Sequence, residues 1–168
     1  MKQLLVFMAL SVAAACTPAQ SKAGGDSTPA MATSDTIVGV VSEVGADPAT
    51  WMALRTPSSA HSLRLSGAGA ATLRSVSGAE VWLSGTQEGS TFRVDAFEVR
   101  RTNGQPVDDG VVRVAGAGVF IRLRSGVERD VPDAPPALRA LDGARIWITR
   151  PVANQAPSFG VIQRRPVG

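Results

Sequence analysis

Histidine and cysteine, two side chains that often carry acid–base or nucleophilic chemistry, each occur once in this sequence of 168 residues. His61 is the only histidine, and it lies in the polar stretch PSSAHS, which predicts a solvated loop. Cys16 is the only cysteine and lies near the N-terminus, so an intramolecular disulfide is impossible. Beyond Cys16, the sequence therefore excludes metal sites built from His and Cys, and it excludes Cys–His nucleophilic catalysis.

Two adjacent carboxylates, Asp108 and Asp109, are the remaining candidates for chemistry. With Asp95 or Glu98 they could form a glycosidase pair or a Ca²⁺ site. Adjacent side chains on an extended chain point apart, however, and the surrounding sequence TNGQPVDD is hydrophilic, so we expect a solvated turn. The serines and the glycine-rich runs lack the spacing of a nucleophile elbow or of a phosphate-binding loop. We therefore expect no enzyme activity, no metal and no cofactor.

An internal repeat organises the elements that would position any binding site. Residues 73–83 (LRSVSGAEVWL) recur as residues 138–148 (LRALDGARIWI). Because side chains alternate along a strand, Trp82 and Trp147 point away from the presumed core. Two indoles are costly to leave in water, so we predict that both are buried between the two copies or under a flanking segment.

Each copy is predicted to consist mainly of β-strands. The first copy, residues 36–101, has expected strands at 36–44, 51–56, 62–66, 80–84 and 92–99, two helical turns at 70–76, and a polar loop at 85–91. The second copy, residues 110–165, repeats that order after a connector at 102–109 that contains an Asn-Gly turn. The alignment pairs residues 39–41 with 110–112, 51–55 with 120–124, and 100–101 with 164–165.

The N-terminus has the features of an export signal. Lys2 precedes an apolar run at 4–15, which has the length of a signal-peptide core and is too short to span a membrane as a helix. Small residues at 13–15 stand directly before Cys16. This stretch resembles the lipobox of bacterial lipoproteins, in which the cysteine becomes the first residue and carries acyl chains. Ala13 stands where that family usually has Leu, which leaves an ordinary signal-peptidase cut after Ala15 as an alternative.

The lipobox resemblance implies a signal peptide at 1–15 and a lipid attachment site at Cys16. Two or more acyl chains would anchor the protein stably in a membrane. Thr17 follows the cysteine, in place of the Asp that marks inner-membrane retention, so we expect the cell envelope, at the periplasmic face of the outer membrane. Residues 16–35 are rich in Ser, Thr, Ala, Gly and Pro, which predicts a flexible tether.

The order of three strands, a short helix and two strands resembles an OB-fold, a five-stranded barrel. The residues that carry the resemblance are Leu73, Gly78, Val81, Leu83, Phe92 and Val94 in the first copy, and Leu138, Gly143, Ile146, Ile148, Phe159 and Val161 in the second. We therefore expect an all-β fold with short helices, arranged as two tandem OB-like five-stranded barrels. One barrel or sandwich shared by both copies is the alternative.

The third strand of the second copy departs from the OB-like pattern. Residues 127–131 (VERDV) are short and acidic, and Pro132, Pro135 and Pro136 follow. Proline lacks the N–H that a sheet ladder needs, so we expect this edge to be only partly formed.

Ligands of OB-folds usually lie across the second and third strands. By alternation, the outward residues there are Trp51, Arg55 and Arg64 in the first copy, and Phe120, Arg122 and Arg124 in the second. An aromatic ring beside an arginine suits a sugar, a nucleotide or a carboxylate-bearing polymer. The alternative is that the aromatic side chains close the barrel ends and the arginines keep edge strands soluble.

These resemblances together predict a non-enzymatic, membrane-anchored lipoprotein that acts as an OB-fold binding module for an envelope glycan or protein. A structural assembly subunit of an envelope complex is the alternative. We expect no nucleic-acid partner, because one aromatic residue per face is too few to stack successive bases. The formal net charge of +3 is also too small to imply such a partner unless the arginines cluster on one face.

Overall fold

The structure is a computed structural model that describes residues 35–150 and 156–165. The predicted signal peptide, Cys16 and almost all of the predicted tether lie outside the described residues. The chain divides into a unit Met1–Met31 and a unit Ala32–Gly168, and the second unit holds both copies of the repeat. That unit is predominantly β-sheet with a few short helices, as expected. In the described part of the chain, the helices are too short to cross a membrane.

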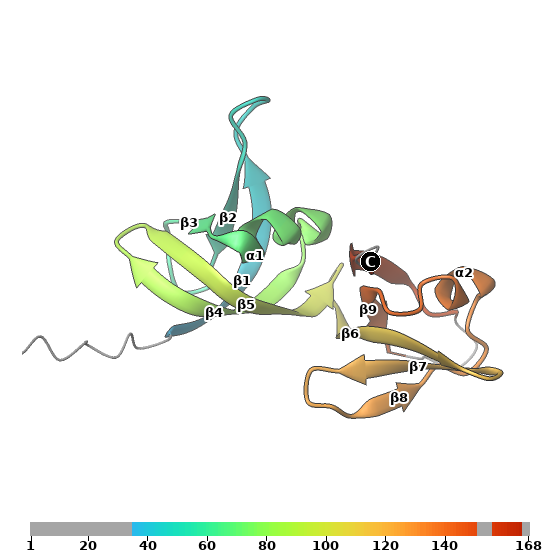
Figure 1. Cartoon of the computed structure of the whole chain (residues 1–168). Coiled ribbons are helices and arrows are strands. Elements are labelled where there is room, and N and C mark those ends of the chain that lie inside the picture. The colour runs from blue at the N-terminus through green and yellow to red at the C-terminus, as the bar shows by residue number, and fades with distance from the viewer. Residues whose placement is uncertain (1–34, 151–155, 166–168) are drawn as a thin grey trace, which may run out of the picture. The chain divides into compact units, whose positions relative to one another are not determined.

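The first copy contains five strands and two short helical segments (Figure 1). In chain order these are β1 (Asp35–Val44), β2 (Trp51–Arg55), β3 (Leu63–Ser66), α1 (Ala68–Thr72), the 3-10 helix η1 (Leu73–Val76), β4 (Glu80–Glu88) and β5 (Thr91–Thr102).

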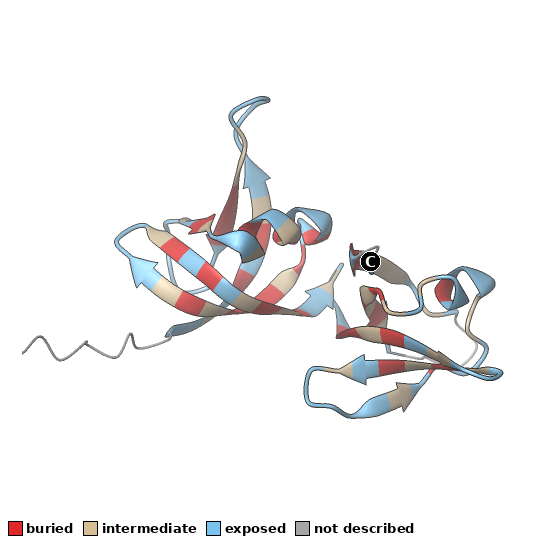
Figure 2. Ribbon diagram, in the orientation of Figure 1, coloured by how far each residue is buried: buried red, intermediate tan, exposed pale blue. Residues whose placement is uncertain are grey.

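The strands of the first copy pair in a closed ring. β1 pairs with β2 and β4, β2 pairs with β3, and β4 pairs with β5, all antiparallel. A parallel pairing between β3 and β5 closes the ring. Figure 2 shows buried and exposed residues alternating along β4 and β5, as expected for strands with one face on a core.

The second copy repeats this strand pairing, except that the pairing that would close the ring is missing among the described residues. Its elements are β6 (Gln105–Ala115), β7 (Gly118–Leu123), β8 (Glu128–Asp130), α2 (Pro136–Arg139), β9 (Arg145–Thr149) and β10 (Phe159–Gln163). β6 pairs with β7 and β9, β7 pairs with β8, and β9 pairs with β10. Among the described residues, no pairing joins β8 to β10. The edge is thus partly formed, because the prolines after Asp130 cannot extend the ladder.

Matching backbone hydrogen bonds show that the sequence repeat is also a structural one. In each copy, the first strand exchanges two bonds with the turn that precedes the fourth strand. The bonds run from Gly78 N to Val41 O (2.8 Å) and from Val41 N to Ala79 O (3.0 Å), and from Gly143 N to Val112 O (2.9 Å) and from Val112 N to Ala144 O (2.9 Å).

The strand registers correct the predicted alignment of the second strands. Val41 lies opposite Leu54, and its counterpart Val112 lies opposite Ile121, so Leu54 corresponds to Ile121. Arg55 therefore corresponds to Arg122 and not to Arg124. The alignment was wrong by two residues, but a shift of two keeps every side chain on its face of the sheet.

Two predicted loops are largely strand. β4 continues to Glu88, so the loop expected at 85–91 shrinks to a tight turn at Gly89 and Ser90. β6 begins at Gln105, inside the expected connector. The predicted Asn-Gly turn is confirmed: Asn103 and Gly104 have φ of 49° and 75°, the conformation of a two-residue hairpin turn. The last strand of the first copy therefore pairs directly with the first strand of the second.

Each copy has its own hydrophobic core, and the first core includes residues from the second copy. Val107 and Ile162 are both 5% exposed and belong to the core of the first copy, and Trp147 packs against that core. The register of β10 against β9 shifts between Val161 and Gln163, and Ile162, at this irregularity, lies in the core of the first copy.

Candidate functional site

Asp108 and Asp109 lie in β6 and are each only 6% exposed. The prediction of a solvated turn at these residues was wrong. The Asn-Gly turn ends before them, so they continue a strand that pairs with β9. As expected for neighbours on a strand, their side chains have different partners, and each partner set includes arginine, which compensates the buried charge.

Asp109 joins strands of the two copies. Arg145, on β9, donates from Nε to Oδ1 (2.8 Å) and from Nη2 to Oδ2 (2.7 Å) of Asp109. The backbone N–H of Val99, on β5, donates to the same carboxylate at 2.8 Å. Arg145 also donates to the carbonyl of Phe97 (2.7 Å), and its guanidinium lies 4.3 Å from the centroid of the Phe97 ring. These contacts fix Arg145 in place.

Asp108 is held by two further arginines. Arg129, on β8, donates from Nη1 to Oδ2 of Asp108. Arg150 donates from Nε to Oδ1 at 3.4 Å. The Arg129 and Arg150 side chains are 41% and 61% exposed, so they cover the buried carboxylate and also face solvent.

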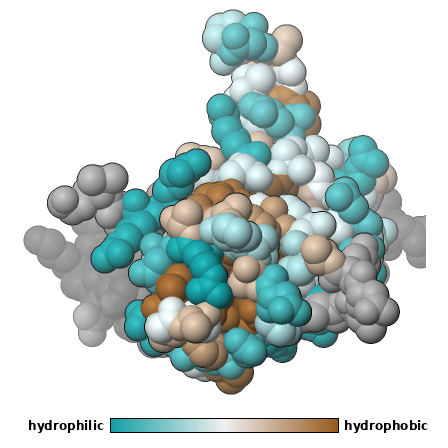
Figure 3. All heavy atoms as spheres, turned by 90° about the vertical axis from the view of Figure 1, so that its right-hand side faces the viewer, coloured by the Kyte–Doolittle hydropathy of each residue, from teal (hydrophilic) through white to brown (hydrophobic). Residues whose placement is uncertain are grey.

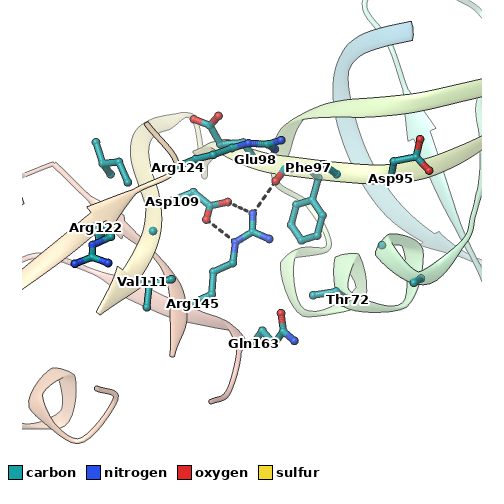
Figure 4. Close-up of a pocket in the computed structure, with 15 residues that line it drawn as sticks. Thr72, Asp95, Phe97, Glu98, Asp109, Val111, Arg122, Arg124, Arg145 and Gln163 are labelled. Carbon is teal, nitrogen blue, oxygen red and sulfur yellow. Dashed lines mark hydrogen bonds and ion pairs between the residues drawn. The ribbon is translucent and has the colours of Figure 1, made fainter. Parts of the chain in front are cut away.

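A cavity of about 530 Å³ lies beside the Asp109–Arg145 pair, and we call it the inter-repeat cavity. The first copy contributes residues of α1 and β5, and the second contributes residues of β6, β7, β9 and β10. Figure 4 shows the Arg145 guanidinium between Asp109 and the ring of Phe97, with Arg122 on the side of the second copy. The apolar lining includes Phe97, Val111 and Leu123.

A second hollow of about 440 Å³ lies over β2 and β3, and we call it the β2–β3 groove. Trp51, Arg64 and Arg74 line it, together with Met52 and Leu65. The Arg64 guanidinium lies 5.7 Å from the centroid of the Trp51 ring, within the range of a cation–π contact.

Arg74, at the side of this groove, is oriented by two neighbours. It donates from Nη2 to the hydroxyl of Thr50 at 3.3 Å and forms an ion pair with Glu43 at 3.7 Å.

The structure divides the six predicted ligand-binding residues between these two sites. Trp51 and Arg64 line the β2–β3 groove, whereas Arg122 and Arg124 line the inter-repeat cavity. Arg55 is exposed on β2 and lines neither site. Phe120 is half-buried, with its ring against Gly118, where an added Cβ would lie 2.8 Å from Cε2. His61 lies in an exposed turn, as predicted, and its N–H binds Ser59 Oγ at 3.1 Å.

Trp82 and Trp147, which were predicted to be buried between the copies or under a flanking segment, are both half-buried, and each contacts the other copy. Trp147 packs against the core of the first copy. The guanidinium of Arg124, from the second copy, lies 5.4 Å from the centroid of the Trp82 ring.

Asp109 was expected to be solvated, and neither Arg145 nor Phe97 was predicted to be part of a site. One signal was present: Arg145 stands where the first copy has Glu80, so the repeat reverses its charge at that position. A charge reversal between aligned copies indicates that the side chain has a different partner in each, which here is Asp109 for Arg145 and Arg101 for Glu80.

Figure 3 shows one face of the molecule, on which hydrophilic residues lie between the hydrophobic ones. Within residues 35–150 and 156–165, no three His, Cys, Asp or Glu side chains gather as metal ligands would. No protein-family model matches the chain, and no curated protein or solved structure matches it significantly.

Proposed function

We propose that this chain is a non-enzymatic binding lipoprotein of the bacterial cell envelope, built from two OB-like copies. A ring in the order β1-β2-β3-β5-β4, with a helix between β3 and β4, supports an OB-like barrel in the first copy. The second copy has the same order with an open seam between β8 and β10, which supports a partial barrel.

The contact between Arg64 and Trp51 in the β2–β3 groove carries the proposal of ligand binding. In the described part of the chain, no carboxylate lies within 4.0 Å of the Arg64 guanidinium, so its hydrogen-bond donors are available to a ligand. The indole offers a flat apolar face to a sugar ring, and the guanidinium offers paired donors to a carboxylate. The ligand that fits this pair is a carboxylate-bearing glycan of the envelope.

Calorimetric titration with peptidoglycan fragments solubilised by a muramidase tests this proposal. Charge-assisted hydrogen bonds to Arg64 should make Arg64→Gln weaken binding about tenfold. Trp51→Ala should weaken it to a similar extent through lost stacking. Arg113→Gln serves as the control, because Arg113 is exposed and lines neither site. Equal affinity of the wild type and both groove variants would contradict the groove assignment.

The proposed anchor is the set of acyl chains on Cys16. In cells fed radiolabelled palmitate, the wild-type chain should acquire label and sediment with outer membranes, since two or more chains give stable anchoring. Cys16→Ser should acquire no label and remain in the soluble periplasmic fraction. Label on the Cys16→Ser variant, or none on the wild type, contradicts lipidation at this residue.

A second candidate function, a structural subunit of an envelope assembly, is favoured by exposed valines on β1. Val38, Val40 and Val44 are 44%, 41% and 38% exposed, and Val38 lies opposite Trp82 on β4. If this face contacts an assembly partner, a photo-crosslinker at Val38 should give one discrete product in intact cells. The groove variants should then leave that product unchanged.

A further inference from the structure

The inter-repeat cavity has the size and the lining of a small-molecule site. Its volume of about 530 Å³ lies within the range of roughly 300 to 1,000 Å³ that ligand pockets occupy. Phe97, Val111 and Leu123 give it an apolar wall, and Arg145, whose guanidinium is held by Asp109 and the carbonyl of Phe97, is part of the same lining. An apolar cavity with a few polar groups fits a ligand that is itself mostly apolar.

One cation at the cavity has no ion-pair partner among the described residues. Six charged side chains line it: Asp95, Glu98, Asp109, Arg122, Arg124 and Arg145. Five of them have ion-pair partners: Asp109 with Arg145 (2.7 Å), Arg122 with Glu128 (3.0 Å), Glu98 with Arg100 (3.3 Å) and Asp95 with Arg93 (3.9 Å). Across the described ranges, Arg124 has no carboxylate within 4.0 Å.

Arg124 instead lies over the ring of Trp82. This contact positions the guanidinium but leaves its N–H groups free of a carboxylate, because a cation–π contact uses the face of the guanidinium rather than its donors. The side chain is exposed and borders the cavity, so a ligand anion can reach it. Among the described residues, Arg124 is therefore the one guanidinium of this lining whose donors no carboxylate engages, and it lies next to an apolar wall.

We propose that the inter-repeat cavity binds a small amphipathic carboxylate, with its apolar body against Phe97, Val111 and Leu123 and its carboxylate on Arg124. This site is separate from the β2–β3 groove and does not depend on glycan binding there. Because both copies contribute lining residues, the duplication itself creates the site.

The probe for this proposal is 2-naphthoate, a flat apolar monocarboxylate, with neutral 2-naphthylmethanol as its matched control. The full chain carrying Cys16→Ser keeps acyl chains and detergent out of the titration. The sequence contains three tryptophans, so a ¹⁵N–¹H correlation spectrum has three indole resonances, and Trp82→Phe assigns one of them. We expect 2-naphthoate to shift the Trp82 indole resonance, and 2-naphthylmethanol to bind about tenfold more weakly or worse.

Arg124→Gln should weaken 2-naphthoate binding about tenfold while the rest of the spectrum keeps its dispersion. Arg113→Gln, an exposed arginine outside the cavity, should bind as the wild type does. Trp51→Ala, which disables the groove, should also leave this affinity unchanged. Equal affinity for acid and alcohol, equal affinity of the wild type and Arg124→Gln, or no binding at millimolar probe would each overturn the proposal.

Discussion

The pair formed by Asp109 and Arg145 shows how one carboxylate can connect two copies of a repeat. The Asp109 side chain is 3% exposed, and its carboxylate accepts hydrogen bonds from Arg145 and from the backbone N–H of Val99. Removing the Asp109 carboxylate would leave Arg145, whose side chain is 27% exposed, without its anion. It would also leave the backbone N–H of Val99 without its acceptor. Loss of one partner of a buried pair costs more than the net contribution of the intact pair.

Asp109→Ala is predicted to lower the free energy of unfolding by about 3 kcal/mol, measured by urea denaturation. The matched control is Asp95→Ala, because that side chain is 56% exposed and its ion pair spans 3.9 Å. The control should stay within about 0.5 kcal/mol of the wild type. Equal stability of the two variants would show that Asp109 does not hold the copies together.

The alternation of side chains along a strand predicted correctly which face of the sheet a residue lies on, but the sequence did not predict correctly which polar residues are buried. Val81 and Leu83 are fully buried and Trp82 is on the opposite face, as the two-residue period requires. Asp108 and Asp109 are buried although their segment is hydrophilic, because a hydrophilic composition does not by itself mean solvation. Their burial depends on arginines 20 or more residues away, and no local pattern contains that information.

In both copies, a glycine on the first strand lies close to the backbone of the second strand. Gly39 on β1 and Gly110 on β6 both lie against the second strand of their copy. An added Cβ would stand 2.5 Å from the carbonyl oxygen of Arg55 in one case and 2.5 Å from that of Arg122 in the other. Both contacts are with backbone, which cannot move aside cheaply.

Gly39→Ala and Gly110→Ala are therefore predicted to destabilise the protein by similar amounts, about 2 kcal/mol each. Thr36→Ala, at an exposed position on β1, is the control and should change stability by about 0.5 kcal/mol or less. Thermal and urea unfolding of the three variants would check this. A cost for only one of the two glycines would mean that the copies do not share this packing.

The order of strands and helices could be predicted from the sequence, whereas registers and boundaries could not. Composition marked residues 85–91 and 102–109 as loops because they are polar, but exposed strand edges are polar too. The two-residue error between 51–55 and 120–124 arose because the β1–β2 loop is longer than the two-residue β6–β7 turn. An alignment based on side-chain type cannot detect a register error of two residues, because a shift of two leaves the alternation of inward and outward side chains unchanged.

At the scale of the whole molecule, the two copies share part of one core. Ile162 belongs to the second copy by sequence and to the core of the first copy by packing. Its carbonyl also accepts a hydrogen bond from Ser75 Oγ at 3.1 Å. A module of about 60 residues buries too little surface to be very stable by itself, so this sharing favours folding as one unit.

Ile162→Ala is predicted to lower the free energy of unfolding by about 3 kcal/mol through the cavity that it leaves. Tryptophan fluorescence and far-UV circular dichroism should still report a single, coincident urea transition. Val127→Ala, at a site that is 56% exposed, is the control with little expected effect. Two separated transitions, with only one moved by Ile162→Ala, would show that the copies unfold independently.

The Trp51 indole resonance reports whether the β2–β3 groove binds a carboxylate-bearing glycan, as we propose. Trp51 lines the groove, whereas Trp82 and Trp147 lie elsewhere, so the three indole signals separate the possible sites. Titration with muramidase-solubilised peptidoglycan fragments should shift the Trp51 signal and leave the other two in place. A shift confined to Trp82 or Trp147, or no shift at saturating fragment, would contradict the claim.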